Sequence, residues 1–284
     1  AALGASVVDA MWERTERVDR LNFAQPALFA LEVALYRLFE SWGLLPDFLL
    51  GHSQGEISIA HVAGVLSLED AAVLVAQRGQ LIDGLPPGGA MVAVQAEEEE
   101  AAMVAACTPG VVGIAAVNSP RSLVVSGEEV AVTRVADHFA DLGRRTRRLR
   151  IAAAGHSRLM APIQDELRAT AERLNWNAPS GPEIISTVTG KKARSEDLAS
   201  PDYWARHLCA TVRFGSALRT SHDLGARFFV ELGPGQGLST MAAETVDSGR
   251  ERFAAPLATE DETGGVAEAL GHAFVIGAPV SWRS

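Results

Sequence analysis

The size and composition of the chain exclude several classes of protein. Its 284 residues are 48% hydrophobic, which is enough for one large core or two unequal ones. A net charge of -10 disfavours contact with phosphate backbones, and no apolar run approaches the roughly 20 residues of a membrane-spanning helix. The only cysteines, Cys107 and Cys209, lack metal-ligand spacing, and no secretory signal opens the chain. We therefore predict a cytoplasmic protein that binds neither nucleic acid nor membrane.

The first third of the chain is predicted to hold helices and one short strand. Apolar residues recur at helical spacing in three segments, and a run too short for a helix precedes the second of them. The expected elements are a helix over 26–42, a strand over 46–50, a helix over 56–65 and a helix from 68 that ends before Gly84. Ser67 begins a capping box for the last helix, and the sequence Pro-Pro-Gly-Gly at 86–89 follows it as a breaker.

From Met91 the periodicity changes to that of a small, separate unit. Strands are expected at 91–95, 111–117, 122–126 and 146–151, with helices from 97 and over 129–142. The order βαββαβ is that of a ferredoxin-like unit. Longer helical patterns then resume, with a helix over 158–175, a strand over 183–188, helical material over 202–220 and a strand over 228–232.

These elements predict an α/β protein of two parts. The alternation of strand and helix at both ends of the chain predicts one large parallel-sheet domain, built from residues 1–89 and 152–284. The ferredoxin-like subdomain at 90–151 is inserted into it. Because the first residue is Ala1 rather than Met, we expect the sequence to be an excerpt from a longer polypeptide.

Ser53 is the candidate nucleophile. It lies at the centre of a Gly-x-Ser-x-Gly pattern between a predicted strand and a predicted helix. In that context a strained turn exposes the hydroxyl, and the N–H groups that follow point at the reacting atom. The alternative is a plain tight turn. A serine hydroxyl needs a base to take its proton, so one of the seven histidines should be its partner.

Three histidines are candidates for that base. The residue order of α/β-hydrolases nominates His222 or His272, but the first lies in a polar stretch and the second in a helical pattern near the end of the chain. His156 begins a predicted helix at the junction where the small unit returns to the large one, and clefts form at such junctions. A capping or surface role for His156 is the alternative.

Arg78 is the candidate anion-binding residue. Its helical neighbours are apolar, so its guanidinium leaves the buried face of a helix and needs an anion there. Two interpretations remain open, namely an internal salt bridge to a carboxylate of the protein and a clamp on the carboxylate of a substrate. The clamp would have no use in an esterase acting on neutral esters.

Five arginines between positions 144 and 150 form the strongest local charge cluster. They lie on or before the last predicted strand of the small unit. Charged side chains protect an edge strand against unwanted pairing. In an acidic chain, a basic cluster can also be the docking site for an acidic partner or a phosphate-bearing cofactor. Both interpretations are kept.

Taken together, these residues resemble the acyltransferase domains of modular type I polyketide synthases, which are related to malonyl-CoA:acyl carrier protein transacylases. The resemblance covers nearly the whole chain, in family order. Its motifs are Gln-Pro-Ala-Leu-Phe-Ala at 25–30, Gly-His-Ser-Gln-Gly-Glu at 51–56, Ser-Leu-Glu-Asp-Ala-Ala at 67–72, Ala-Val-Asn at 116–118, Val-Ser-Gly at 125–127, Ser-Thr-Val-Thr-Gly at 186–190, Tyr-Trp at 203–204 and Val-Arg-Phe at 212–214. The implied fold is a large α/β-hydrolase-like domain with the small ferredoxin-like subdomain inserted.

The resemblance implies a role for each site residue. Ser53 would attack an acyl-CoA thioester, His156 would act as base and then acid, and Arg78 would bind the free carboxylate of a malonyl-type group. A backbone carbonyl at His207 would orient His156 in place of a triad carboxylate. The substrate site would further include Gln25, His52, Gln54, Ala153, Ala154 and Gly155.

The oxyanion hole is expected to be only half present in this sequence. The backbone N–H of Gln54 would supply one donor. In the family the other comes from a Gly-Gln-Gly loop after an N-terminal strand, and we expect both to lie upstream of Ala1. The same three letters at 235–237 match a different segment of the family and are not given this role.

The residues before the catalytic histidine predict the extender unit. Methylmalonyl-selecting relatives typically carry Tyr-Ala-Ser there and malonyl-selecting ones His-Ala-Phe, whereas this chain has Ala-Ala-Gly at 153–155. The lost bulk leaves room at the α-carbon of the substrate, and Gln54 resembles the residue of branched-unit selectors. We expect ethylmalonyl-CoA or a larger alkylmalonyl-CoA, then methylmalonyl-CoA.

The resemblance also implies the partners. The acyl group would go to the phosphopantetheine thiol of an acyl carrier protein, beside the ketosynthase and linker domains of the same megasynthase, with no permanently bound cofactor. Two alternatives are kept. An α/β serine hydrolase, an esterase or thioesterase, would be indifferent to Arg78→Ala, and a noncatalytic docking segment would form no acyl adduct on Ser53.

Overall fold

The first part of the large body is built around two long helices that pack against each other. The computed structural model describes residues 6–12, 20–151 and 153–282. The elements before the small sheet are α1 (Val7–Trp12), α2 (Leu21–Ser41), β1 (Phe48–Leu49), α3 (Gly55–Val62) and α4 (Leu68–Asp83). As the sequence predicts, the Ser67 hydroxyl caps α4 by accepting the N–H of Asp70. Helix α2 begins earlier than expected, with Pro26 inside it.

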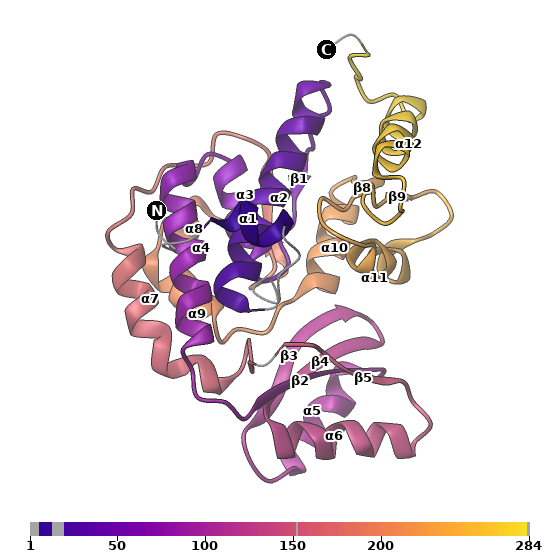
Figure 1. Cartoon of the computed structure of the whole chain (residues 1–284). Helices are drawn as coiled ribbons and strands as arrows, with labels where there is room; N and C mark the ends of the chain where they lie inside the picture. Colours follow the sequence, from indigo (N-terminus) through magenta and orange to yellow (C-terminus); the bar gives the residue numbers. More distant parts are fainter. Residues whose placement is uncertain (1–5, 13–19, 152, 283–284) are drawn as a thin grey trace.

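A four-stranded antiparallel sheet forms the small part of the molecule. Its elements are β2 (Gly89–Val94), α5 (Glu98–Cys107), β3 (Val112–Ser119), β4 (Ser122–Glu128), α6 (Glu129–Asp141) and β5 (Thr146–Arg148). The strand order is β3-β4-β2-β5, with every neighbouring pair antiparallel. Figure 1 shows α5 and α6 on the side of this sheet that faces away from the large body.

The small sheet is buried on both faces, and this joins the two parts of the molecule. On one face Val92 and Val125 pack in a cluster with Phe139 of α6. On the other face Met91 and Val124 pack in a cluster that contains residues from the second half of the large body. Because successive side chains of a strand point to opposite faces, each of these strands serves both cores.

The second half of the large body contains short elements. They are the 3-10 helix η2 (Arg158–Ile163), α7 (Gln164–Ala171), β6 (Glu183–Ser186), β7 (Lys191–Lys192), α8 (Ser195–Leu198), α9 (Pro201–His207), α10 (Phe214–Asp223), β8 (Phe228–Val230), α11 (Gly237–Val246), β9 (Arg252–Ala254) and α12 (Glu262–Val275). The helix predicted over 158–175 is divided into η2 and α7, and Pro162 lies at the end of η2.

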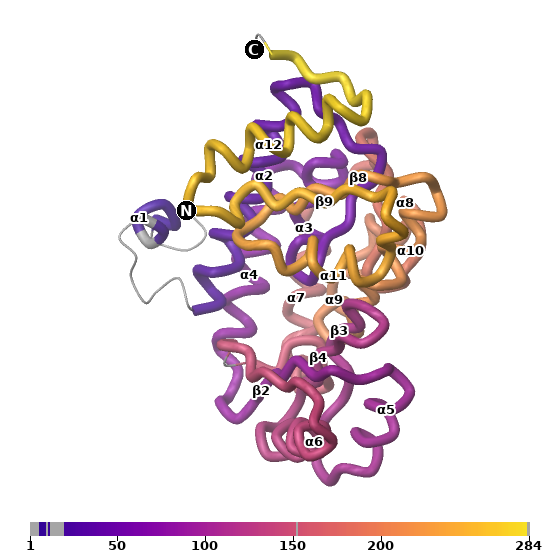
Figure 2. Tube along the Cα trace, turned by 90° about the vertical axis from the view of Figure 1, so that its right-hand side faces the viewer, coloured from indigo at the N-terminus to yellow at the C-terminus, as the bar shows by residue number. Residues whose placement is uncertain are grey.

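The parallel strands of the large body form two separate pairs. Strand β1 pairs with β6 and β8 pairs with β9, both in parallel, while β7 adds an antiparallel edge to β6. The single parallel sheet expected from the sequence is thus discontinuous within the described residues. Strands β8 and β9 lie with α12 toward the end of the molecule opposite to α5 and α6 (Figures 1 and 2).

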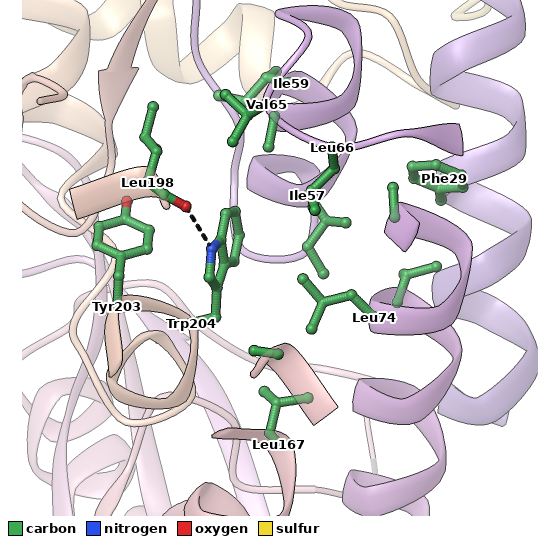
Figure 3. Packing of buried hydrophobic residues seen from close by; sticks show 14 of the residues in the cluster. Phe29, Ile57, Ile59, Val65, Leu66, Leu74, Leu167, Leu198, Tyr203 and Trp204 are labelled. Atoms are coloured by element: carbon green, nitrogen blue, oxygen red, sulfur yellow. Dashed lines mark hydrogen bonds between the residues drawn. The ribbon is translucent and has the colours of Figure 1, made fainter. Parts of the chain in front are cut away.

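The architecture is the expected mixed α/β fold, a large body with an inserted small sheet. The core of the large body gathers around Trp204, which is 2% exposed and stacks on Trp176 with ring centroids 5.7 Å apart. Its indole N–H donates to the carbonyl of Leu198, as Figure 3 shows. No helix among the described residues is long and apolar enough to cross a membrane.

Replacing Trp204 with alanine should lower the free energy of unfolding by about 3 to 5 kcal/mol, because the change leaves a cavity and an unpaired carbonyl in the core. Urea denaturation of the two proteins measures the difference. Trp282→Ala is the matched control, since Trp282 is 58% exposed, and it should cost much less. Equal losses in the two variants would contradict the assignment of Trp204 to the main core.

Candidate active site

Ser53 lies in a strained turn between β1 and α3. Its φ angle of 53° is in the left-handed region that a residue with a side chain rarely adopts. The turn is closed by hydrogen bonds from Gly55 N–H to His52 O and from Glu56 N–H to Ser53 O, each 3.0 Å long. A Cβ at Gly51 would lie 2.3 Å from the backbone nitrogen of Glu56, so the turn requires glycine there. This is the strand-turn-helix geometry predicted for a nucleophile.

His156 lies within hydrogen-bond distance of the nucleophile. Its Nε2 is 2.7 Å from Ser53 Oγ, and its Nδ1 is 2.8 Å from the carbonyl oxygen of Ala210. A carbonyl can only accept, so Nδ1 carries the proton and Nε2 presents its lone pair to the serine hydroxyl. Burial, followed by the cation of Arg78, lowers the pKa of His156 to about 3. The imidazole is therefore neutral and able to accept a proton.

Backbone carbonyls of the loop after α9 orient His156. The shortest contact to Nδ1 comes from Ala210, and the backbone of His207 also raises the pKa of His156. The N–H of His156 also donates to the carbonyl of Leu208. The backbone of the loop after α9 thus holds the histidine. The positions of these carbonyls depend on the path of the loop and not on the side chains in it.

Arg78 lies beside the nucleophile without a carboxylate partner. The side chain is 4% exposed; Nη1 donates to Gln25 Oε1 at 2.7 Å and Nη2 to Ser53 Oγ at 3.2 Å. Its Nε has no hydrogen-bond partner in the described part of the chain. Burial lowers the pKa of Arg78 to about 10, which leaves it charged at neutral pH. The internal salt bridge considered from the sequence is not formed among the described residues.

The remaining predicted substrate residues divide into two groups. Gln25, His52 and Gln54 line, with Ser53 and Arg78, one end of a cavity of about 800 Å³ that extends between β1 and β8. The other group, which comprises Ala153, Ala154 and Gly155, does not line this cavity. Ala153 packs in the main core, and Ala154 lies against Gly89.

Two polar residues near the site were missed by the sequence analysis. Asn118 of β3 places Oδ1 2.8 Å from Nε2 of His52, so the small sheet contributes a contact beside the nucleophile. Glu32 of α2 accepts hydrogen bonds from the side chains of Gln54 and Ser58. Glu32 follows Gln25 by two helical turns, and this spacing was the signal that could have revealed it.

The other candidates for the base lie in different surroundings. His222 places Nε2 2.8 Å from Oε1 of Glu251, and His272 is 43% exposed with Glu268 at 3.9 Å. Each therefore has a carboxylate neighbour of its own and makes no described contact with Ser53. No group of three His, Cys, Asp or Glu side chains in the described ranges is arranged to hold a metal ion.

Comparison with known proteins identifies the family. The acyl transferase domain family matches residues 1–278, and the chain belongs to it. Among curated relatives, it is 50% identical to polyketide synthase GfsB of Streptomyces halstedii over 98% of the chain, and 46% identical to mycoketide-CoA synthase of Mycobacterium tuberculosis over 97%. The chain spans only 5% and 7% of the lengths of these two proteins.

Solved structures agree with this assignment. The acyltransferase domain from the second module of the salinomycin polyketide synthase is 44% identical, with a TM-score of 0.92 over 99% of this chain and 66% of that one. A malonyl CoA-acyl carrier protein transacylase from Coxiella burnetii is 27% identical, with a TM-score of 0.85 over 94% of this chain and 86% of that one. These structures are acyltransferase domains and transacylases, in agreement with the family to which the chain belongs.

The carboxyl of Glu32 should make the stability of the protein depend on pH. Burial raises its pKa from 4.5 to about 7, so between these values the folded chain holds a proton that the unfolded chain has lost. Stability therefore falls as pH rises through this window, and Glu32→Gln removes the effect. The unfolding free energy of the wild type should fall, relative to that of Glu32→Gln, by on the order of 2 kcal/mol between about pH 5 and about pH 8.

Denaturation at several pH values measures this difference. The exposed carboxylate of Glu99 provides a matched control, because Glu99→Gln should follow the wild type at every pH. A Glu32→Gln curve parallel to that of the wild type would mean that Glu32 is ionised throughout.

Proposed function

We propose that this chain transfers a malonyl-type acyl group from coenzyme A to a carrier-protein thiol through Ser53. Nε2 of His156 takes the hydroxyl proton as Ser53 Oγ attacks the thioester carbonyl. The C–S bond then breaks, and the coenzyme A sulfur leaves with the proton from His156. An ester on Ser53 remains. The backbone N–H of Gln54, at the start of α3, is the donor we assign to the oxyanion.

The second half of the reaction reverses these roles. His156 takes the proton of the incoming phosphopantetheine thiol, the sulfur attacks the ester, and Ser53 leaves with the proton. A base that is neutral at physiological pH and fixed in one tautomer suits both steps. The acyl-CoA and the carrier thiol are substrates, and the chemistry assigned to Ser53 and His156 requires no resident cofactor.

The observation that carries the proposal is the buried guanidinium of Arg78 next to Ser53 Oγ. A buried cation with no carboxylate partner is costly, and an anionic ligand relieves that cost. A carboxylate two bonds from the thioester carbon, as in a malonyl group, would meet the guanidinium while the carbonyl lies at Ser53. Arg78 therefore selects acyl groups that carry a free carboxylate.

The acceptor and the neighbouring domains are proposed from the relatives. Polyketide synthases of many times the length of this chain contain the matching segment, which supports an acyl carrier protein as acceptor and ketosynthase and linker domains as neighbours. The arginines at 144–150 lie in the edge strand β5 and on either side of it. Arg144 and Arg148 already pair with Glu100 and Glu129, which favours edge protection over carrier docking.

For the extender unit we propose ethylmalonyl or a larger alkylmalonyl group, then methylmalonyl. The small side chains at 153–155, which do not line the cavity at Ser53, support this because they leave the segment before His156 without bulk. A Cβ at Gly155 would meet only the sulfur of Met91, at 3.7 Å. A relative that is 32% identical, the acyltransferase domain of SpnD, was solved in complex with 2-(pent-4-yn-1-yl)malonyl, an alkylmalonyl group.

Arg78→Ala should lower the rate of acylation by malonyl-type CoA thioesters about a hundredfold, because the substrate carboxylate loses its charged partner. Acylation by acetyl-CoA, which has no carboxylate, should not fall with it. Stopped-time intact-mass analysis measures both rates. Ser53→Ala should form no adduct, and Arg134→Ala, which removes an exposed arginine, should behave as the wild type. Equal loss with both thioesters would contradict the clamp.

A competition experiment tests the extender unit. The protein is incubated briefly with equimolar malonyl-, methylmalonyl-, ethylmalonyl- and butylmalonyl-CoA, and the adduct on Ser53 is identified by intact mass. We expect ethylmalonyl or butylmalonyl to dominate, and Gly155→Ser to shift the preference toward methylmalonyl, with each methylene contributing about 1 to 3 kcal/mol. A dominant malonyl adduct in the wild type would refute the proposed pocket and leave the transferase activity intact.

A further inference from the structure

A buried carboxyl lies directly behind the nucleophile turn. Glu56 follows Ser53 by one helical turn in α3 and is 2% exposed. Its Oε1 contacts the backbone N–H of Thr187 and lies 2.7 Å from Thr187 Oγ1, while its Oε2 accepts the hydroxyl of Tyr203. Neither a lysine nor an arginine is paired with it among the described residues; the nearest basic atom is Nε2 of His207, at 3.8 Å.

The hydrogen atoms around Glu56 can be counted. The hydroxyl of Thr187 has one hydrogen and lies 2.8 Å from the carbonyl of Gly51, which can only accept. If the hydroxyl donates its one hydrogen to that carbonyl, it has none left for Glu56. The contact between Thr187 Oγ1 and Glu56 Oε1 then needs a hydrogen on the carboxyl. An ionised Glu56 would leave either this contact or the one to Gly51 without a hydrogen.

The other end of the network agrees with this count. Ser186 Oγ accepts the N–H groups of Val188 and Thr189, so its own hydrogen is free for the hydroxyl of Tyr203, 2.7 Å away. Tyr203 in turn donates to Glu56. Each hydroxyl then donates once, in a single direction from Ser186 through Tyr203, Glu56 and Thr187 to the carbonyl of Gly51.

We propose that Glu56 holds a proton in the folded enzyme and acts as a positioning residue, the central donor of a hydrogen-bond chain that fixes the turn carrying Ser53. The chain joins the end of β6 and helix α9 to Gly51, two residues before the nucleophile. Thr187 is anchored further, because its carbonyl accepts the N–H of Arg213. The consequence for catalysis rests on the proposed function, whereas the protonation of Glu56 does not.

The surroundings of Glu56 favour the neutral acid. Burial raises its pKa, against the hydrogen bonds from the hydroxyls of Tyr203 and Thr187 and from the backbone N–H groups of Thr187 and Val188. The basic group that faces it, His207, is also buried, and burial holds its pKa well below the usual value, so it supplies no cation. His207 packs edge to face on His156 with ring centroids 5.6 Å apart. A charge on Glu56 would draw a proton to His207, beside the catalytic base.

Infrared spectroscopy tests the proton directly. At about pH 8 the wild type should show the carbonyl band of a protonated carboxylic acid that is absent from Glu56→Gln, since desolvation can hold a buried glutamic acid neutral to that pH. Glu32→Gln is the matched control, because it removes the other buried carboxyl of raised pKa and should retain the band of Glu56. A wild-type spectrum with carboxylate bands and no band of a protonated acid would overturn the proposal, whatever the activity of the protein.

If Glu56→Gln does not fold, the wild type answers the same question. A carbon-13 NMR titration of glutamate-labelled protein should show one carboxyl, besides that of Glu32, that keeps its proton well above the pH at which a free glutamic acid loses it. Titration of every glutamate except Glu32 below about pH 6 would overturn the proposal.

The positioning role is tested through Thr187, which touches no substrate in the proposed reaction. Thr187→Val removes the donor to Gly51 and should lower kcat for transfer about tenfold with KM for the acyl-CoA unchanged, as a misplaced nucleophile does. Thr187→Ser retains the hydroxyl and should restore kcat. A Thr187→Val enzyme with normal kcat would contradict this role, and so would one in which KM rises while kcat stays unchanged.

Discussion

The burial of Arg78 beside Ser53 is the constraint on which the rest of the site depends. Among the described residues its cation contacts two neutral partners, Gln25 and the nucleophile itself. A buried charge in this state raises the free energy of the empty site and favours a ligand with a carboxylate. Burial lowers the pKa of His156 most, and the same cation lowers it further, so the base is neutral. One buried cation therefore acts both on the kind of ligand that the site favours and on the pKa of the candidate base.

The fold brings these groups together from distant parts of the chain. Arg78 comes from α4, Gln25 from α2, Ser53 from the turn after β1, and His156 from the segment that follows the small sheet. The small sheet is packed on both faces and holds Asn118 against His52, so the insertion also supports the site. Such an arrangement keeps the candidate nucleophile, base and anion-binding residue in fixed relative positions, which efficient catalysis requires.

Much of the fold follows from local patterns. The helices of the first third, the capping by Ser67 and the βαββαβ order all have short-range signals, since apolar periodicity and turn residues act within a few positions. The division of one expected helix into η2 and α7, and of the parallel strands into two pairs, has no such signal. Strand pairing is decided by partners far away in the chain.

The sequence by itself determined the nucleophile turn, because Gly51, Ser53 and Gly55 form a local steric pattern, and it determined that Arg78 faces the core. It could not decide whether Arg78 meets a protein carboxylate, or which carbonyl holds His156. The contacts of Glu32 and Glu56 were also beyond it. Each of these depends on distances between elements far apart in the chain, and such distances exist only once the layers have packed.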